Sequence, residues 1–249
     1  MKISIITACY NSAATIEGTI KSVLSQDHPD VEYIIVDGAS KDNTLQVVDR
    51  YRDRIAKIIS EKDQGIYDAI NKGIAAATGE VIGLLHSDDI YANDEVLSRV
   101  TKLFGEKKSD SVYADLHYVN KDDISKVVRY WHSGEYYDGI FKKGWMPPHP
   151  TFFLKRSCYE KFGVYNLEMK TAADYELMLR MLHRYKVSTA YLPEVIVKMR
   201  VGGKSNVTLG SRIKANRDDK RAWKLNGLKP GLFTLILKPL SKISQFFKK

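Results

Sequence analysis

Two adjacent carboxylates, Asp88 and Asp89, come shortly after the apolar run 81–85, separated from it by His86 and Ser87. A short run of this kind predicts a buried parallel strand, and open α/β sheets bind ligands beyond the carboxyl ends of their strands. Carboxylates at that edge suit Mg²⁺ or Mn²⁺, which takes one or two of them and leaves its other positions to phosphate oxygens and water. The structural alternative is a loop whose Asp caps the following helix, which Asp94 and Glu95 would open.

Two more polar side chains lie at predicted strand ends. Tyr10 follows the apolar run 3–8, and Asp37 follows the run 33–36. A tyrosine there can stack on a nucleobase or pack under the loop, and a carboxylate can accept a hydrogen bond from a base N–H or a ribose hydroxyl. No Gly-x-Gly-x-x-Gly and no Gly-x-x-x-x-Gly-Lys-Ser/Thr pattern follows any predicted strand, so neither a dinucleotide-binding fold nor a P-loop is indicated.

The elements that position these residues alternate between strand and helix over residues 1–90, which is typical of a parallel sheet covered by helices. Apolar stripes at helical spacing follow each strand, and the third stripe contains Ile66, Ile70 and Ile74 and ends at Gly79. The four strands are predicted at 3–8, 33–36, 58–59 and 81–85.

The second half of the chain is less regular. It predicts a strand at 111–119, a turn at 121–125 and an antiparallel return at 127–131. The segment 134–152 is rich in Gly, Pro and aromatic residues, and we expect a partly ordered loop over the site. A helix is predicted from Asp174 to about His183, followed by a strand at 187–192.

The charge of the chain is concentrated at its C-terminal end. The 249 residues are 44% hydrophobic, which is enough for one α/β domain with a tail. Residues 198–249 hold fourteen Lys and Arg against two Asp, a net +12, so the rest carries −3 of the overall +9. From Leu228 onward basic residues lie beside an apolar stripe, which is typical of a helix lying on an anionic membrane. Docking on the protein's own core is the alternative, and nucleic acid is not an expected partner.

Cysteine usage and hydropathy bear on the compartment. Cys9 and Cys158 are far apart and have no neighbour at metal-ligand spacing, so we expect reduced thiols in a cytosolic protein. The N-terminus shows no signal-peptide pattern, and the apolar run 232–237 is far shorter than the roughly 20 residues that span a bilayer. The expected location is cytoplasmic and peripheral on the inner face of the cytoplasmic membrane.

Four segments, in order, resemble the motif series of family 2 glycosyltransferases: 5–11, 34–44, 63–73 and 87–89. The third has the sequence Asp-Gln-Gly-Ile-Tyr-Asp-Ala-Ile-Asn-Lys-Gly and is most similar to bacterial enzymes that assemble surface polysaccharides. The resemblance covers roughly residues 1–200. It implies a GT-A fold, an α/β fold in which a nucleotide-binding parallel sheet merges with a small mixed sheet for the acceptor.

The resemblance also implies how the chain is divided. Residues 1–201 would form the catalytic domain, with the nucleotide-binding part at about 1–118 and the acceptor part at about 119–201. Residues 202–249 would be a basic amphipathic extension.

The resemblance further implies a set of donor contacts. In the family the positions of Tyr10 and Asp37 hold the nucleobase, the position of Asp63 lies near the nucleoside, and Asn71 belongs to the same donor site. The acidic pair would bind ribose and the Mn²⁺ or Mg²⁺ that bridges the diphosphate, with Asp88 taking part in both contacts.

Two positions depart from the family pattern. Gly38 stands where the family often has a second Asp, which leaves Asp37 alone at the base. The donor is therefore open among UDP-, GDP- and dTDP-sugars, with a UDP-sugar favoured. His86 stands in place of the first carboxylate of the family's Asp-x-Asp, so Asp88 and Asp89 would hold the metal without it.

Asp174 matches the acceptor-side acid that the family places ahead of a Leu-rich helix. An inverting transfer needs a base to take the proton of the attacking hydroxyl, and a partly desolvated carboxylate suits that task. A helix N-cap is the structural alternative, and Glu176 is the reserve base. His149 lies between prolines in 147–152, a stiff segment that can place an imidazole near a ligand or phosphate. An ordinary hydrogen-bonded loop histidine is the alternative there.

The leading hypothesis is an inverting, metal-dependent glycosyltransferase that extends a lipid-linked glycan in cell-surface polysaccharide biosynthesis. A sugar-1-phosphate nucleotidyltransferase would show a Gly-rich loop after its first strand, whereas this chain has Ala8-Cys9-Tyr10-Asn11. A non-catalytic nucleotide-sugar binding protein is the third possibility. The presence of the acidic pair and of Asp174 argues against it.

Overall fold

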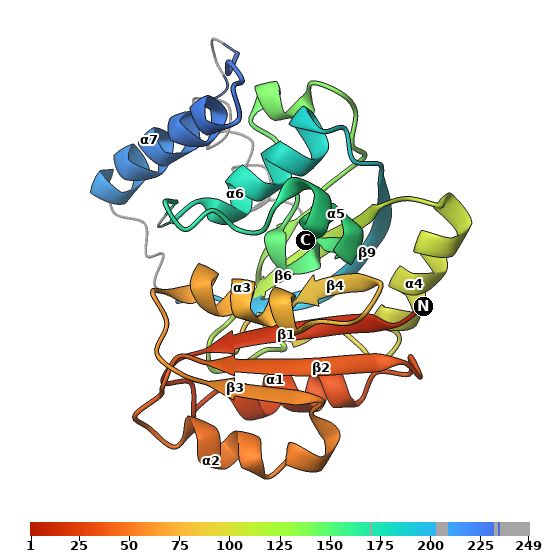
Figure 1. The fold of residues 1–249 in the computed structure, drawn as a ribbon, viewed down its shortest axis with the longest axis vertical. Coiled ribbons are helices and arrows are strands. Elements are labelled where there is room, and N and C mark those ends of the chain that lie inside the picture. The colour runs from red at the N-terminus through yellow and green to blue at the C-terminus, as the bar shows by residue number, and fades with distance from the viewer. Residues whose placement is uncertain (170, 203–208, 232–233, 235–249) are drawn as a thin grey trace.

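The computed structural model describes residues 1–169, 171–202, 209–231 and 234. A nine-stranded mixed sheet runs through them, with strand order β3-β2-β1-β4-β8-β6-β9-β5 and with β7 paired to β6 outside this row. Helices cover both faces of the sheet (Figure 1). The predicted α/β class is confirmed.

The first half follows the predicted alternation of strand and helix. The strands β1, β2, β3 and β4 are parallel to one another. A helix precedes each of β2, β3 and β4 and returns the chain to the edge of the sheet where the strands begin. The elements are β1 (Ile3–Cys9), α1 (Ile16–Leu24), β2 (Val31–Asp37), α2 (Thr44–Asp49), η1 (Arg52–Arg54), β3 (Lys57–Ser60), α3 (Ile66–Ala76), β4 (Val81–Leu84), β5 (Ile90–Tyr91) and α4 (Val96–Lys107).

Two apolar cores lie on opposite faces of the sheet. One contains the buried side of α3 and the other contains the buried sides of α1, α2 and α4. Gly73 lets α3 approach β1 closely, because a Cβ atom there would clash with the side chain of Ile6. Ile66 was expected in the buried stripe, but it is 47% exposed because it occupies the first turn of α3, at the sheet edge where the loop from β3 ends.

The second half contains the predicted hairpin and elements that the sequence did not predict. β6 (Ser111–Val119) and β7 (Val127–Trp131) pair antiparallel, as expected. The short β8 (Phe153–Lys155) lies between β4 and β6 and is antiparallel to both. β9 (Thr189–Arg200) runs far past the predicted end at residue 192, because its register with β6 shifts beside Pro193 and the strand then resumes.

The remaining helices pack over the face that α3 covers. The predicted helix from Asp174 exists, but its last turn is π-helical. The elements are η2 (Ile140–Lys143), η3 (His149–Thr151), α5 (Arg156–Phe162), α6 (Ala173–Met178), the π-helical turn η4 (Leu179–Arg184) and α7 (Leu209–Leu225).

The helix α7 lies against α6 (Figure 1). Trp223 is fully buried, and its Nε1 donates to Tyr175 Oη at 2.9 Å. This part of the basic extension therefore docks on the protein's own core, the alternative considered for the sequence. The apolar tail residues predicted to touch a membrane fall mostly at 232–233 and 235–249, outside the described residues. Among the helices that the structure describes, none is long and apolar enough to cross a membrane.

Candidate active site

Residues from four distant segments meet along one edge of the sheet. Because β1, β2, β3 and β4 are parallel, their carboxyl ends point the same way. Tyr10 follows β1, Asp37 ends β2, Asp63 follows β3 and the acidic pair follows β4. The strand register thus assembles the site that the sequence predicted in outline.

A pocket lies beyond the ends of β1, β2 and β3. Tyr10 is 49% exposed in this pocket, as expected for a ring that stacks on a planar ligand. Lys41 and Lys62 add positive charge, which favours a ligand that carries phosphates. The lining residues are Tyr10, Gly38, Ala39, Lys41, Lys62 and Asp63.

The absence of a side chain at position 38 has a steric explanation. A Cβ atom at this position would clash with Asp63 Oδ2 and touch the Tyr10 ring. Asp63 is held in place by its other oxygen, since Oδ1 accepts a hydrogen bond from Gly65 N at 2.9 Å. Asp63 therefore occupies the space of a side chain at position 38 and presents an acceptor beside Tyr10.

Asp37 differs from expectation. Its carboxylate is fully buried and accepts hydrogen bonds from Ser40 N at 3.0 Å, from Ser60 Oγ at 2.8 Å and from Ser40 Oγ. It does not line the pocket. In this structure Asp37 fixes the loop that carries Ala39 and Lys41, and Asp63 is the carboxylate that lines the pocket.

Asp174 lies in the first turn of α6 and contacts two other segments. Tyr67 Oη, from the first turn of α3, donates to Asp174 Oδ1 at 3.3 Å. His149 Nδ1 lies 3.4 Å from Asp174 Oδ2, and His149 Nε2 lies 2.9 Å from His86 Nε2. The side chains of Asp174 and His149 are 21% and 25% exposed. The structure thus joins three predicted residues, Asp174, His149 and His86, in one chain of contacts.

The protonation of this chain follows from its surroundings. Burial and the neighbouring His149 lower the pKa of His86 to about 3, although Asp174 acts in the opposite direction. A neutral His86 that donates its Nε2–H to His149 Nε2 would leave Nδ1 of His149 as the protonated nitrogen that faces Asp174. Burial and the Asp174 carboxylate raise the pKa of Tyr67, which therefore stays a donor. Tyr67 and His149 thus contact the two different oxygens of the Asp174 side chain.

The turn that carries the acidic pair is fixed through its main chain. Arg200, the last residue of β9, donates from Nη1 to the carbonyl oxygen of Asp88. Thr19 Oγ1 donates to the carbonyl oxygen of Asp89 at 2.7 Å. Ser87 Oγ, just before the pair, lies 2.9 Å from Ser12 Oγ of the loop after β1. The side chains of the pair are therefore presented from a rigid turn.

The carboxylate of Asp89 is fully buried, and neither oxygen has a hydrogen-bond partner among the described residues. Burial and the neighbouring Asp88 hold the pKa of Asp89 well above its usual range, against the opposing effect of Arg200. Burying such a group without a partner is unfavourable, and a hard divalent cation is a suitable one.

His86 does not replace the missing first carboxylate, because its Nε2 faces His149. Within the described part of the chain, no group of three His, Cys, Asp or Glu has the geometry of a metal site. An ion held by Asp88 and Asp89 would therefore have to take its remaining ligands from phosphates and water.

Two expected site residues have structural partners instead. Asn71 Nδ2 donates to Tyr165 O at 2.9 Å and Asn71 Oδ1 accepts from Tyr165 N at 3.0 Å, so the amide ties α3 to the loop after α5. Glu176, the reserve base, is 3% exposed and accepts from Arg180 Nε at 2.9 Å and from Asn226 Nδ2 at 3.1 Å. Its charge is balanced inside the core, which removes it as a proton acceptor for a substrate.

Sequence reasoning missed Tyr67 and Arg200. Tyr67 stands inside the third motif, so a signal was present, but its partner Asp174 lies more than a hundred positions away. Arg200 had no local signal, because its contact with the acidic turn arises from the pairing of β5 with β9.

The parallel sheet, the pocket at its edge, the acidic pair after β4 and the acid that begins α6 define the GT-A class of glycosyltransferase. The sequence model of the family described as glycosyl transferase family 2 matches residues 4–166, and the chain belongs to this family.

Curated relatives agree with this assignment. A PGL/p-HBAD biosynthesis glycosyltransferase of Mycobacterium bovis is 30% identical over 210 residues, which are 82% of this chain and 78% of the relative. An uncharacterized glycosyltransferase of a Nostoc species is 37% identical over 123 residues, 48% of this chain and 37% of the relative. The chain is a glycosyltransferase, and neither the nucleotidyltransferase nor the non-catalytic alternative is supported.

Solved structures share the fold. S. aureus TarS 1-349 in complex with UDP-GlcNAc has a TM-score of 0.71 and 21% identity, covering 91% of this chain and 65% of that chain. The mannosyltransferase PcManGT from Pyrobaculum calidifontis in complex with GDP-Man and Mn²⁺ has a TM-score of 0.66 and 20% identity, covering 95% and 68%. The chain thus spans about two thirds of these proteins, and the likeness shows the GT-A fold.

The two acids at the start of α6 have different roles, which stability measurements can separate. Glu176→Ala leaves Arg180 buried without its counter-charge, so we expect a loss of about 3–5 kcal/mol in the free energy of unfolding. Asp174→Ala is the matched control on the same helix and should cost less than about 1 kcal/mol, because the side chain is partly exposed and its contacts are long. Urea unfolding checks both values. Equal stability of the two variants would contradict the structural role of Glu176.

Proposed function

We propose that the protein is an inverting glycosyltransferase that transfers a sugar from a nucleotide-sugar donor to a glycan acceptor. The observation that supports this most strongly is the contact chain from Asp174 through His149 to His86. His86 lies two residues before Asp88, so a proton acceptor lies beside the segment where the donor diphosphate is expected.

In the proposed reaction the acceptor hydroxyl attacks the anomeric carbon from the face opposite the diphosphate. A bond forms between the acceptor oxygen and that carbon, and the bond from the carbon to the diphosphate oxygen breaks, so the electron pair leaves with the nucleoside diphosphate. The hydroxyl proton moves to Asp174. Tyr67 and His149 each hold one oxygen of this carboxylate, which fixes its orientation before the acceptor arrives.

The favoured donor is a UDP-sugar. Tyr10 would stack on the base, and Asp63 Oδ2 would accept a hydrogen bond from the imide N–H of uracil. Lys41 and Lys62 add charge that is complementary to a nucleotide. The complex of TarS with UDP-GlcNAc supports a UDP donor in this fold.

Asp88 and Asp89 would hold a divalent cation, Mn²⁺ or Mg²⁺. When bound, such an ion neutralises the charge that develops on the leaving diphosphate. The buried, unpartnered carboxylate of Asp89 and the complex of PcManGT with Mn²⁺ support this part of the proposal.

The proposed acceptor is a lipid-linked glycan of the cell surface, reached from the cytoplasmic face of the membrane. The third sequence motif and the basic, apolar tail support this acceptor. A relative named for PGL/p-HBAD biosynthesis agrees with it.

Asp174→Asn should cut turnover by about 10² to 10⁴, the range expected for the loss of a general base. Nucleotide-sugar binding should stay within about two-fold of the wild type, because Asp174 does not line the nucleoside pocket. Release of nucleoside diphosphate from UDP-Glc, UDP-Gal, UDP-GlcNAc and GDP-Man measures the first effect, and calorimetry measures the second. Asp122→Asn, an exposed acid on the β6–β7 turn, is the control. Normal turnover in Asp174→Asn would sink the assignment.

Removing either carboxylate of the pair should weaken metal binding. We expect Asp88→Asn and Asp89→Asn to bind Mn²⁺ about ten-fold more weakly or worse in the presence of UDP, at least the loss seen when a group that supports a metal ligand is removed. Electron paramagnetic resonance of free Mn²⁺ gives the affinity without any turnover. Asp94→Asn, an exposed acid on the same connection between β4 and α4, should bind like the wild type. An unchanged affinity in both pair variants would refute the metal assignment.

We propose that residues 235–249, which lie outside the described residues, bring the enzyme to an anionic membrane. They contain Lys238, Lys242, Lys248 and Lys249 beside apolar residues, and each Lys near an anionic leaflet contributes about 1 kcal/mol. A chain that ends at Thr234 keeps the docked Trp223 and should sediment less with phosphatidylglycerol vesicles than the full chain does. Phosphatidylcholine vesicles are the control. Equal sedimentation of both chains with phosphatidylglycerol vesicles would rule out the anchor.

A further inference from the structure

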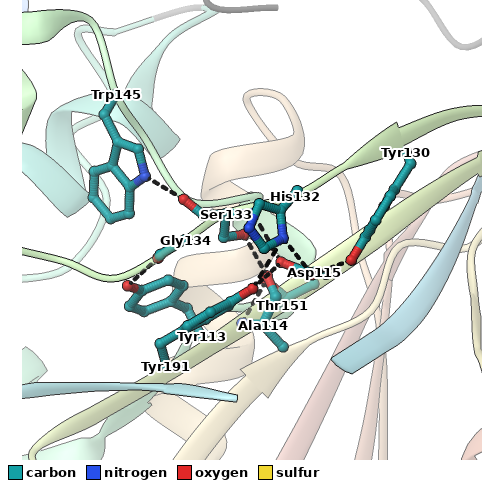
Figure 2. Close-up of polar contacts among 10 residues, drawn as sticks. All are labelled: Tyr113, Ala114, Asp115, Tyr130, His132, Ser133, Gly134, Trp145, Thr151 and Tyr191. Carbon is teal, nitrogen blue, oxygen red and sulfur yellow. Dashed lines mark hydrogen bonds and ion pairs between the residues drawn. The ribbon is translucent and has the colours of Figure 1, made fainter. Parts of the chain in front are cut away.

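A second cluster of polar and aromatic side chains lies around Asp115 of β6 and includes residues of β7, of the segment after β7 and of β9 (Figure 2). Asp115 is 1% exposed, and four donors surround its carboxylate. Oδ1 accepts from Ser133 N at 2.7 Å and from Tyr191 Oη at 2.8 Å. Oδ2 accepts from His132 Nδ1 at 3.0 Å and from Tyr130 Oη. The buried charge is therefore fully satisfied, and it holds three aromatic side chains in fixed positions.

The rings form a row of edge-to-face and tilted contacts that runs from β6 through β7 and the residue after it to β9. The centroids of His117 and Tyr130 are 5.2 Å apart, those of Tyr130 and His132 are 5.9 Å apart, and those of His132 and Tyr191 are 6.1 Å apart. None of the four residues is buried, and the His132 side chain is 45% exposed. We call this surface the aromatic platform: His117, Tyr130, His132 and Tyr191.

Asp115 also determines which polar atoms the platform offers. Because His132 Nδ1 faces Asp115, Nε2 is the ring nitrogen left for a ligand. Burial and the Asp115 contact raise the pKa values of Tyr130 and Tyr191, whose hydroxyls stay protonated and directed at the carboxylate. What these tyrosines offer a ligand is ring surface. A rigid surface of this kind costs little entropy to order on binding.

The platform is joined to the active site through Ala114, the neighbour of Asp115. Thr151 Oγ1 donates to Ala114 O at 2.9 Å, and Ser133 Oγ donates to the same oxygen at 2.7 Å. Both ends of the segment 134–150 are thereby tied to one residue of β6. His149 and Thr151 belong to the same 3₁₀ turn, and His149 contacts Asp174. The hydrogen bonds at Ala114 therefore connect the platform with the turn that contacts Asp174.

We propose that the aromatic platform binds a sugar unit of the acceptor glycan, separate from the sugar that carries the reacting hydroxyl. A pyranose has an apolar C–H face, which packs on aromatic rings, and a rim of hydroxyls, which can donate to His132 Nε2. This inference rests on the glycan acceptor of the proposed function and names where one of its sugars binds.

Saturation-transfer NMR on the full chain tests the platform without donor or metal. The probes are the methyl β-glycosides of glucose, galactose and N-acetylglucosamine, each measured alone. At least one should bind, and His132→Ala should weaken that binding by about two- to ten-fold, the effect of losing one hydrogen bond. Tyr191→Phe keeps the ring and should retain most of the binding. Tyr137→Ala removes a 48% exposed tyrosine outside the platform and is the matched control.

Two results would overturn the inference: no binding of any of the three glycosides to the wild type, or equal affinity in His132→Ala and the Tyr137→Ala control. His132→Gln is the second variant, used if His132→Ala lowers the unfolding temperature. Because neither donor nor turnover is needed, the result is separate from the proposed function. A protein that releases nucleotide from UDP-sugars yet binds no glycoside keeps that function and loses the platform.

Discussion

A carboxylate removed from water must be balanced by hydrogen bonds, by a counter-charge or by a metal ion, and this requirement separates the acids of the protein by role. Asp37 and Asp115 are satisfied by hydrogen-bond donors from neighbouring segments, and Glu176 is balanced by Arg180. Asp89 is the buried acid of the described chain with no partner on either oxygen. The satisfied acids hold loops and helices in position. The unsatisfied acid lies where a cation and a diphosphate would complete it.

The strand β6 connects the parallel first half of the sheet, through β8, with the strands of the second half. It pairs with β8 near its start, with β7 near its end and with β9 along its length. The change of partner from β8 to β7 occurs beside Ala114 and Asp115, where the side chains of Thr151 and Ser133 make hydrogen bonds to the main chain of Ala114. The change of strand partner and these hydrogen bonds therefore occur at the same residues of β6. The loop that carries His149 is anchored there at both ends.

The sequence predicted the parallel half well because burial on both faces gives those strands continuous apolar runs, and the apolar stripes of the helices follow directly. The short β8 was not predicted, since three residues carry no periodicity and their pairing depends on β4 and β6. The sequence did not predict that Asp63 lines the pocket and Asp37 does not. This depends on how the loops after β2 and β3 fold, which no local pattern indicates. The pairing of Glu176 with Arg180 was different: the i,i+4 spacing was visible in the sequence and argued for a structural role. The Asp115 cluster draws on three strands and could be found only in three dimensions.

The contact between positions 38 and 63 means that the two loops cannot vary independently. An Asp introduced at position 38 would meet the carboxylate of Asp63, and two acids in contact disfavour each other's charged form. A side chain at position 38 would require the Asp63 carboxylate to turn away from its present place in the pocket. We therefore expect positions 38 and 63 to vary together. An acid on the loop after β2 could take the place of the acid on the loop after β3, and the charge of the pocket would stay the same.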